Sequence, residues 1–180
     1  VKDHPEIAHV KLLKFGGDTK LEWNKMAAEL NQNRQVTKII LDLRNNPGGY
    51  LQSAVDIAGD FLPQGSVVVI EEEGNGRRQE FKTTLAPHLN NYTLVILANQ
   101  GSASASEILA GALRDKKNIK LIGENTFGKG SVQEPQQLEN GGGLHITIAK
   151  WLTPNGRWTN SPKIKEIKLY QKQVKYLHGY

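Results

Sequence analysis

The sequence contains no cysteine, which excludes structural disulfides and thiolate metal sites from these 180 residues. It has no apolar run of the length that crosses a bilayer, and its first residues, "VKDHPEIAHV", lack the apolar core of a signal peptide. Neither absence assigns a compartment, because cysteine-free chains occur inside and outside cells. The content of 38% hydrophobic and 23% charged residues is typical of one ordinary globular domain.

Positive charge is modest and concentrated near the C-terminus. The net charge is +5, and lysines recur beside Tyr170 and Tyr176 in the last segment: Lys163, Lys165, Lys168, Lys172 and Lys175. Such a strip can bind nucleic acid. A solvated face of a terminal strand or helix explains it more simply, so we predict no nucleic-acid partner. We divide the chain into a core, residues 1–160, and a basic tail, residues 161–180, whose structure is left unassigned.

Hydrophobic periodicity predicts strands that alternate with single helices. Strands are expected at residues 9–15, 39–43, 66–70, 93–99 and 119–124, and helices at 18–33, 51–62 and 104–114. Asp18 or Thr19 is the candidate cap of the first helix. Residues 71–84 are expected to form a hairpin or loop, and the glycine-interrupted residues 136–158 to form antiparallel strands. The alternation predicts an α/β fold with a largely parallel sheet, flanking helices and a β-rich C-terminal part.

Three informative loops follow predicted strands: "RNNPGG" (44–49), "NQGSASAS" (99–106) and "GENTFGKG" (123–130). Ligands of parallel sheets meet the loops at the carboxyl ends of the strands. We therefore expect the three loops to converge on one side of the sheet.

The third loop matches most of a phosphate-binding pattern, G-x-x-x-x-G-K-[ST]. The last position is Gly130, which has no hydroxyl to hold magnesium. The residues that follow include Pro135 and make a poor helix, although a helix N-terminus should face the phosphates. A nucleotide site is therefore not predicted.

The second loop places Ser104 at the start of a predicted helix. Ser104 and Glu107 fit the capping box S-x-x-E, which is a purely structural reading. A serine at a helix N-terminus also lies beside unpaired N–H groups that can stabilise an oxyanion. The two roles are compatible, and this pattern alone does not choose between them.

A serine nucleophile needs a base, and no histidine lies in the three loops. The G-x-S-x-G elbow is also missing, because Ser106 occupies the place of its second glycine. A lysine can act instead when burial favours its neutral form. Lys129 is the only lysine in the three loops, and a lone lysine in a glycine-rich turn is more often plain surface charge. As the base it would have to be uncharged, so we expect its amine to be sheltered from water.

In order along the chain, "ILDLRNNPGGYLQSAVDIAGDFLP", "GSASASEILAGALRD" and "GENTFGKGSVQ" strongly resemble the carboxyl-terminal processing proteases of peptidase family S41, from about residue 7 to residue 158. The resemblance implies a crotonase/ClpP-like core. It also implies a nucleophile, Ser104, and a lysine base, Lys129, which lies 25 positions later in the sequence. Gln133 matches the third member, which orients the lysine.

Some accounts of the family place an aspartate in the relay, and Asp115 is the matching residue. If residues 104–115 form one helix, its rise of 1.5 Å per residue separates Ser104 from Asp115 by about 16 Å. No direct hydrogen bond spans that distance, so we expect Asp115 to be structural.

By resemblance, the oxyanion hole combines Gly48 or Gly49 with the N–H of Ala105, where glycine allows the backbone to approach a substrate closely. The expected function is that of a serine endopeptidase that cleaves near the C-terminus of protein substrates with apolar C-termini. It needs no organic cofactor and no metal. The alternative is a non-catalytic peptide-binding or scaffold module that retains this core.

Family members usually carry a PDZ domain, which reads the substrate C-terminus, and no such segment is found in this sequence. Whether that domain is lost or naturally absent stays open, as does the oligomeric state. The resemblance also implies an extracytoplasmic location, such as the periplasm, the outer face of a membrane, a secreted form or the chloroplast lumen.

Overall fold

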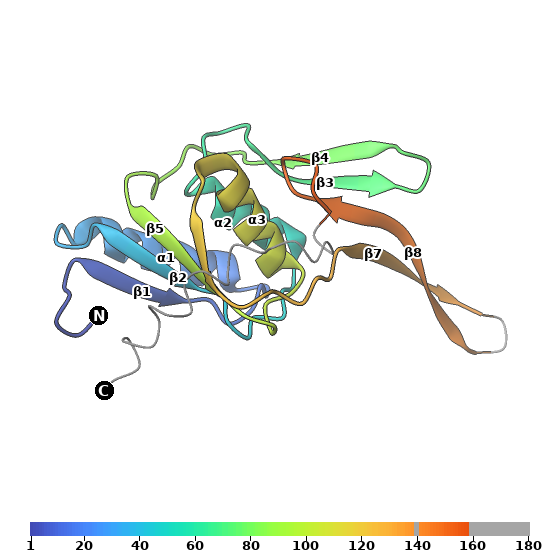
Figure 1. Ribbon diagram of the computed structural model, residues 1–180, viewed down its shortest axis with the longest axis horizontal. Helices are drawn as coiled ribbons and strands as arrows, with labels where there is room; N and C mark the ends of the chain where they lie inside the picture. Colours follow the sequence, from blue (N-terminus) through green and yellow to red (C-terminus); the bar gives the residue numbers. More distant parts are fainter. Residues whose placement is uncertain (139–140, 159–180) are drawn as a thin grey trace.

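The computed structural model of the chain describes residues 1–138 and 141–158. Two four-stranded sheets form its framework, one parallel and one antiparallel (Figure 1). The elements in chain order are β1 (Ile7–Lys11), α1 (Thr19–Gln32), β2 (Lys38–Asp42), α2 (Leu51–Gly59), β3 (Val67–Glu73), β4 (Arg78–Lys82), β5 (Thr93–Ala98), α3 (Ala105–Lys117), β6 (Lys120–Gly123), β7 (Ser131–Gln137) and β8 (Gly143–Leu152). The basic tail lies outside the described residues, so the division at residue 160 stays a prediction.

The parallel sheet has the strand order β1-β2-β5-β6. Every neighbouring pair is parallel, and Leu41 of β2 lies opposite Ile96 of β5. Both side chains are fully buried, whereas Ile40 between two buried neighbours is only partly buried. One face of the sheet therefore packs against the core, as alternating side chains require. The predicted parallel sheet is confirmed.

The antiparallel sheet has the order β4-β3-β8-β7 and contains two hairpins. Residues 71–84, predicted as a hairpin or loop, supply the end of β3 and all of β4. The glycine-interrupted segment supplies β8, and β7 pairs with it. The β-rich C-terminal part is therefore present, although its sheet also takes in β3 and β4 from the middle of the chain.

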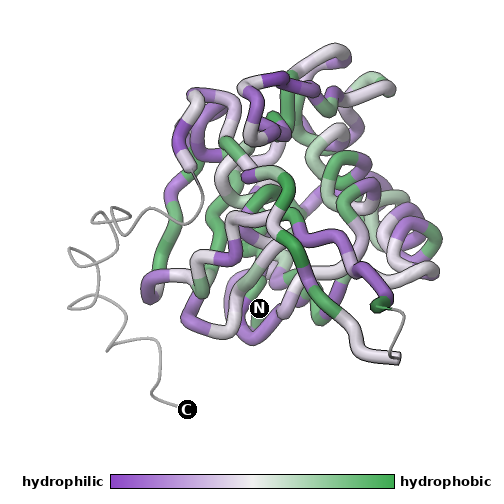
Figure 2. The backbone as a smooth tube through the Cα atoms, turned by 90° about the vertical axis from the view of Figure 1, so that its right-hand side faces the viewer, coloured by the Kyte–Doolittle hydropathy of each residue, from purple (hydrophilic) through white to green (hydrophobic). Residues whose placement is uncertain are grey.

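Helices α2 and α3 lie between the two sheets (Figure 1). Helix α3 contacts β6 of the parallel sheet and β3 of the antiparallel sheet. The largest fully buried side chains come from all these layers: Phe15, Phe61, Ile39, Leu41, Leu43, Ile57, Leu62, Leu89, Ile96, Leu109, Leu113 and Val68. Figure 2 shows hydrophobic segments running through the interior of the fold beside hydrophilic segments at its periphery. Burial of this apolar surface is the main force that holds the layers together.

The helix ends differ from the sequence prediction by up to three residues, and α3 continues to Lys117 instead of ending at residue 114. The helix expected at 51–62 ends at Gly59, and Phe61 and Leu62 are buried in the turn that follows. The apolar periodicity continues past the helix because these turn residues still face the core. Helix α1 begins after Asp18, whose side chain makes no capping bond.

Among the described residues, no helix is long and apolar enough to span a membrane.

Candidate active site

The three loops predicted to converge do so at the carboxyl ends of β2, β5 and β6. The side-chain amides of Asn45 and Asn99 join the first two loops, since Asn99 Nδ2 donates to Asn45 Oδ1 at 2.9 Å and the Asn45 N–H donates to Asn99 Oδ1 at 2.9 Å. The third loop joins them through the Phe127 N–H, which donates to the Ser102 carbonyl oxygen at 2.9 Å. Neighbouring parallel strands end at one edge of the sheet, which is why loops far apart in sequence meet here.

The three serines of the second loop differ in what holds them. Ser102 Oγ donates to the Leu43 carbonyl oxygen at 2.8 Å, and Ser106 Oγ donates to the Asn46 carbonyl oxygen at 3.0 Å. Both serines are buried, whereas Ser104 is only partly buried. Two of the serines therefore tie the second loop to the first, and Ser104 is the one that reaches the surface.

Ser104 has a strained backbone. Its φ of 55° and ψ of −116° lie outside the regions that residues with side chains favour. It occupies the sharp turn between β5 and the first turn of α3. A nucleophilic serine at a strained strand-to-helix turn is a recurring enzyme arrangement, because the turn presents the hydroxyl at the end of the sheet. The backbone thus supports the choice of Ser104 over its neighbours.

Glu107 is the centre of the hydrogen bonding around this turn. Its Oε2 accepts the N–H of Ser104 at 2.8 Å and the N–H of Lys129 at 2.9 Å. Its Oε1 accepts the Thr126 hydroxyl and the Gly128 N–H, both at 2.7 Å. The side chain is buried, so these four donors compensate the removal of the carboxylate from water. One carboxylate therefore fixes the serine turn and the lysine loop to each other.

Sequence reasoning found only part of this role. The capping box predicted that Glu107 would accept the Ser104 N–H, and that bond is present. The bonds to the third loop were missed, because sequence spacing cannot show that residues 126–129 fold over the first turn of α3. In the sequence, the only indication that Glu107 has a role was its place in the capping box with Ser104.

The two loop glycines have different hydrogen-bond environments. The Gly48 N–H donates to Asn46 Oδ1 at 2.9 Å, in a buried position. The N–H groups of Gly49 and Ala105 meet no acceptor among residues 1–138 and 141–158. The N–H groups of Gly49 and Ala105 are therefore unengaged by the described residues, whereas the Gly48 N–H is already engaged.

Both glycines also need their lack of a side chain. A Cβ on Gly48 would lie 2.6 Å from the Ala103 carbonyl oxygen and 2.8 Å from Ser104 Cβ. A Cβ on Gly49 would lie 2.0 Å from the Phe15 carbonyl oxygen. The φ values of 96° and 139° independently favour glycine at both positions.

Lys129 and Gln133 are both exposed in this structure. The Lys129 backbone is fixed by Glu107, but its side chain forms no ion pair with the described residues. Gln133 lies in β7 opposite Thr147, where the register of the hairpin shifts. The expectation that Lys129 is sheltered from water is therefore wrong for the part of the chain that the structure describes.

Asp115 has structural partners in the last turns of α3. Its Oδ1 accepts two hydrogen bonds from the Arg114 guanidinium, at 2.9 Å and 3.0 Å, and its Oδ2 accepts the Asn155 N–H at 3.2 Å. Helix α3 is continuous from Ala105 through Asp115. Asp115 therefore connects the helix to the turn after β8, which agrees with the prediction that Asp115 is a structural residue.

Histidines contact carboxylates outside the three loops. His9 Nε2 lies 3.0 Å from Asp42 Oδ2, and His88 Nδ1 lies 2.8 Å from Asp60 Oδ1. Asp42 is fully buried at the end of β2. Burial raises the pKa of its carboxyl. Hydrogen bonds from the Arg44 side chain and backbone and from His9 lower this pKa by more than burial raises it, so the pKa is about 2. The ionised Asp42 holds the side chain of Arg44, the first residue of the first loop.

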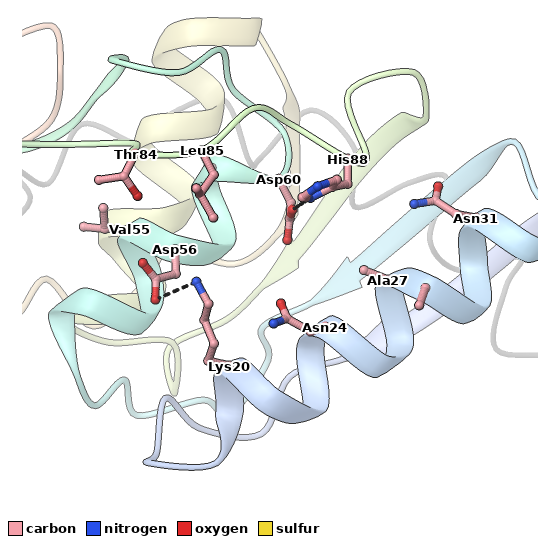
Figure 3. Close-up of a pocket in the computed structure, with 12 residues that line it drawn as sticks. Lys20, Asn24, Ala27, Asn31, Val55, Asp56, Asp60, Thr84, Leu85 and His88 are labelled. Carbon is pink, nitrogen blue, oxygen red and sulfur yellow. Dashed lines mark hydrogen bonds and ion pairs between the residues drawn. The ribbon is translucent and has the colours of Figure 1, made fainter.

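A separate cavity of about 300 Å³ lies between α1, α2 and residues 84–88 (Figure 3). Two ion pairs flank it: Lys20 with Asp56, at 3.1 Å, and His88 with Asp60. None of the predicted site residues lines this cavity. Within the described ranges, no group of three histidine, aspartate or glutamate side chains is placed to hold a metal ion.

Several known proteins are similar to this chain in sequence. Residues 6–166 match peptidase family S41. The chain is 35% identical over 159 residues to the carboxy-terminal processing protease CtpB of Bacillus subtilis, covering 88% of this chain and 33% of that protein. It is 41% identical over 151 residues to the carboxyl-terminal-processing protease of Synechocystis, covering 82% of this chain and 34% of that protein.

A solved structure has the same fold. The photosystem II D1 C-terminal processing protease superposes with a TM-score of 0.79 at 35% identity, covering 86% of this chain and 39% of that one. The chain thus spans about a third of the length of the curated relatives it matches. The match to the family extends over most of the sequence and includes all three loops, so the chain belongs to peptidase family S41.

Proposed function

We propose that this chain carries the core of a serine endopeptidase that cleaves near the C-terminus of protein substrates. The observation that carries the proposal is the Glu107 carboxylate, whose Oε2 accepts the N–H groups of both Ser104 and Lys129. A nucleophile and its base need fixed relative positions. The names of the relatives describe carboxyl-terminal processing, and this specificity is part of the proposal.

In the proposed reaction, the neutral amine of Lys129 accepts the proton of Ser104 Oγ while Oγ bonds to the peptide carbonyl carbon. The carbonyl oxygen takes the negative charge and accepts hydrogen bonds from Ala105 and Gly49. Gly48 is the less suitable donor of the pair, because Asn46 occupies its N–H. Gln133 is the group proposed to orient the lysine amine.

The intermediate then collapses and the carbon–nitrogen bond of the peptide breaks. The departing amine takes the proton from the Lys129 ammonium, which restores the neutral base. Water next gives a proton to Lys129 and attacks the acyl-serine. The carboxylic acid product leaves, and the proton returns to Ser104 Oγ. These steps need no group beyond the chain, the substrate and water.

Exposure of Lys129 sets a requirement for this mechanism. A lysine acts as a base when it is removed from water, so we propose that a bound substrate or a further domain covers the Lys129 side chain. We propose an extended substrate segment with an apolar C-terminus in this role, added beside a strand. A PDZ domain, whether in a longer form of this protein or as a separate partner, is the proposed reader of that C-terminus.

The exposed lysine also favours a second candidate, a non-catalytic peptide-binding or scaffold module that retains the core. In that case Ser104 would serve only as a turn residue, and Lys129 would carry plain surface charge. The two candidates differ in one measurable property, which is whether the Ser104 hydroxyl is activated.

Labelling with a fluorophosphonate probe, with mass mapping of the modified residue, separates them. We expect modification of Ser104 and cleavage of a peptide with an apolar C-terminus. Lys129→Ala should lower both rates by about a thousandfold, which is the size of a general-base contribution. Lys116→Ala removes another exposed lysine and should change neither rate. Labelling of Ser104 that is equal in Lys129→Ala and the unmodified protein would contradict the dyad.

We further propose that the protein works outside the cytoplasm, as its resemblance to the processing proteases implies. Fractionation of cells that produce the native gene product tests this. Recovery in the periplasmic, secreted or membrane-surface fraction is expected, and recovery in the cytoplasm alone would refute it.

A further inference from the structure

The β7–β8 hairpin has one strand edge that no residue in the ranges 1–138 and 141–158 covers. Strand β3 pairs with β8 only from Ala149 to Leu152, while β7 pairs with β8 along nearly its whole length. Residues 144–148 of β8 are therefore paired on one side only among the described residues. Figure 1 shows this part of the hairpin projecting away from the rest of the fold. An isolated two-stranded hairpin is only marginally stable in water.

The two edges of this hairpin differ in how they are protected. The outer edge of β7 carries Glu134 and Pro135, and charged residues and proline are the usual devices that prevent strand pairing. Residues 144–148 of β8, "LHITI", contain no lysine, acidic residue or proline. The β8 edge therefore lacks the protection that the β7 edge has.

The uncovered stretch also carries exposed apolar side chains. Leu144, Ile146 and Ile148 are 49%, 37% and 41% exposed, high values for large apolar residues in a strand. They occupy alternate positions, which share one face of a regular strand. The pairing of β7 with β8 shifts between Val132 and Gln133, so that Ile148 has no directly opposite residue on β7. Exposed apolar groups of this kind mark interaction surfaces.

We propose that β8 pairs with β8 of a second copy of this chain, antiparallel and with the two-fold axis at Ile146. In this register Ile146 of one copy faces Ile146 of the other, and Leu144 faces Ile148. A two-fold interface requires such self-complementarity, and the alternation of apolar residues around Ile146 supplies it. Residues 144–148 contain no lysine, arginine, aspartate or glutamate that would favour a partner of opposite charge. This inference does not depend on the proposed function.

The contact is small, because only five residues of each strand take part. Interfaces well below about 1,200 Å² are typical of weak and transient complexes. We therefore expect a dimer whose population rises with protein concentration rather than a permanent one.

Sedimentation velocity of the full 180-residue chain, over a concentration series from low micromolar to near millimolar, tests the proposal. The unmodified protein should shift from monomer to dimer. Ile146→Lys places like charges opposite each other and should raise the dissociation constant about tenfold or more. Leu21→Lys changes another exposed apolar residue, on α1, and should leave dimerisation unchanged.

Mixing Ile146→Lys with Ile146→Glu gives the decisive readout. The two variants should form a mixed dimer more tightly than either associates with itself, because residue 146 faces its own counterpart. Circular dichroism and the melting temperature check that each variant is folded. A monomer at every concentration, a dimer indifferent to Ile146→Lys, or a mixture that fails to restore pairing would each overturn the proposal.

Discussion

Glu107 and Lys129 are joined through the Lys129 backbone and not through its side chain: Glu107 Oε2 accepts the Lys129 N–H at 2.9 Å. The carboxylate thus fixes the backbone of the loop, whereas the Lys129 amine pairs with no acidic side chain among residues 1–138 and 141–158. Because the same oxygen accepts the Ser104 N–H, the geometry of the site depends on a residue that need not touch the substrate. Glu107 is a positioning residue.

Replacement of Glu107 should therefore damage folding as well as activity. Glu107→Ala removes the acceptor of four part-buried hydrogen bonds, and we expect a loss of about 3 kcal/mol or more in the free energy of unfolding. Glu107→Gln keeps one oxygen and should lose less. Urea denaturation measures both. Glu124→Gln, on an exposed residue of the same loop, is the control and should stay within about 0.5 kcal/mol.

The sequence predicted the parallel sheet and the serine turn for identifiable reasons. Buried runs such as Ile39–Leu43 alternate with amphipathic helices, and this pattern leaves few other folds. Convergence of the loops followed from the rule that parallel strands end at one edge of the sheet. Ser104 could be selected because the family motif fixes its distance from Lys129.

What escaped prediction depends on contacts between distant segments. The role of Glu107 requires that residues 126–129 cross α3, and no local pattern encodes this crossing. Exposure of Lys129 was missed for the same kind of reason, since burial of a loop side chain depends on what covers it. The end of α2 at Gly59 was missed because Phe61 and Leu62 face the core without being helical.

Gly49 should be far less replaceable than other exposed glycines. A Cβ there would lie 2.0 Å from the Phe15 carbonyl oxygen, and the φ of 139° is unfavourable for alanine. We expect Gly49→Ala to lower the free energy of unfolding by about 3 kcal/mol or more, or to prevent folding. Gly17→Ala is the matched control, because a Cβ on Gly17 meets nothing within 4 Å. Equal urea midpoints for the two variants would show that the chain near Gly49 can move aside.

Asp42 should make stability sensitive to acid. Burial raises the pKa of its carboxyl, but hydrogen bonds from Arg44 and His9 lower it more, from 3.8 to about 2. The unfolded chain therefore takes up the proton first as the pH falls. The stabilisation is complete above about pH 4 and is lost as the pH approaches 2, at a cost of about 2 kcal/mol.

Asp42→Asn tests that assignment. The variant should be less stable at neutral pH, and its free energy of unfolding should fall less between pH 4 and pH 2 than that of the unmodified protein. Urea denaturation at several pH values supplies the comparison. Identical acid profiles for Asp42→Asn and the unmodified protein would assign the effect to other carboxyl groups.

Phe127 is the side chain that we expect to contact substrate, if the proposed function holds. Its ring is 69% exposed, while its N–H is fixed to the Ser102 carbonyl oxygen at 2.9 Å. A rigid backbone that presents an aromatic ring beside a nucleophile is suited to binding an apolar substrate residue. Removing that contact should lower kcat/KM for a peptide with an apolar C-terminus about tenfold.

The comparison must separate binding from folding. Phe127→Ala should leave the free energy of unfolding within about 0.5 kcal/mol of the original, because an exposed ring contributes little to the core. It should also leave fluorophosphonate labelling of Ser104 intact, since the Glu107 bonds do not involve the ring. Leu85→Ala, 57% exposed at the cavity of Figure 3, should change neither stability nor turnover. If Phe127→Ala unfolds the protein instead, the ring belongs to the fold; if turnover is unchanged, the substrate lies elsewhere.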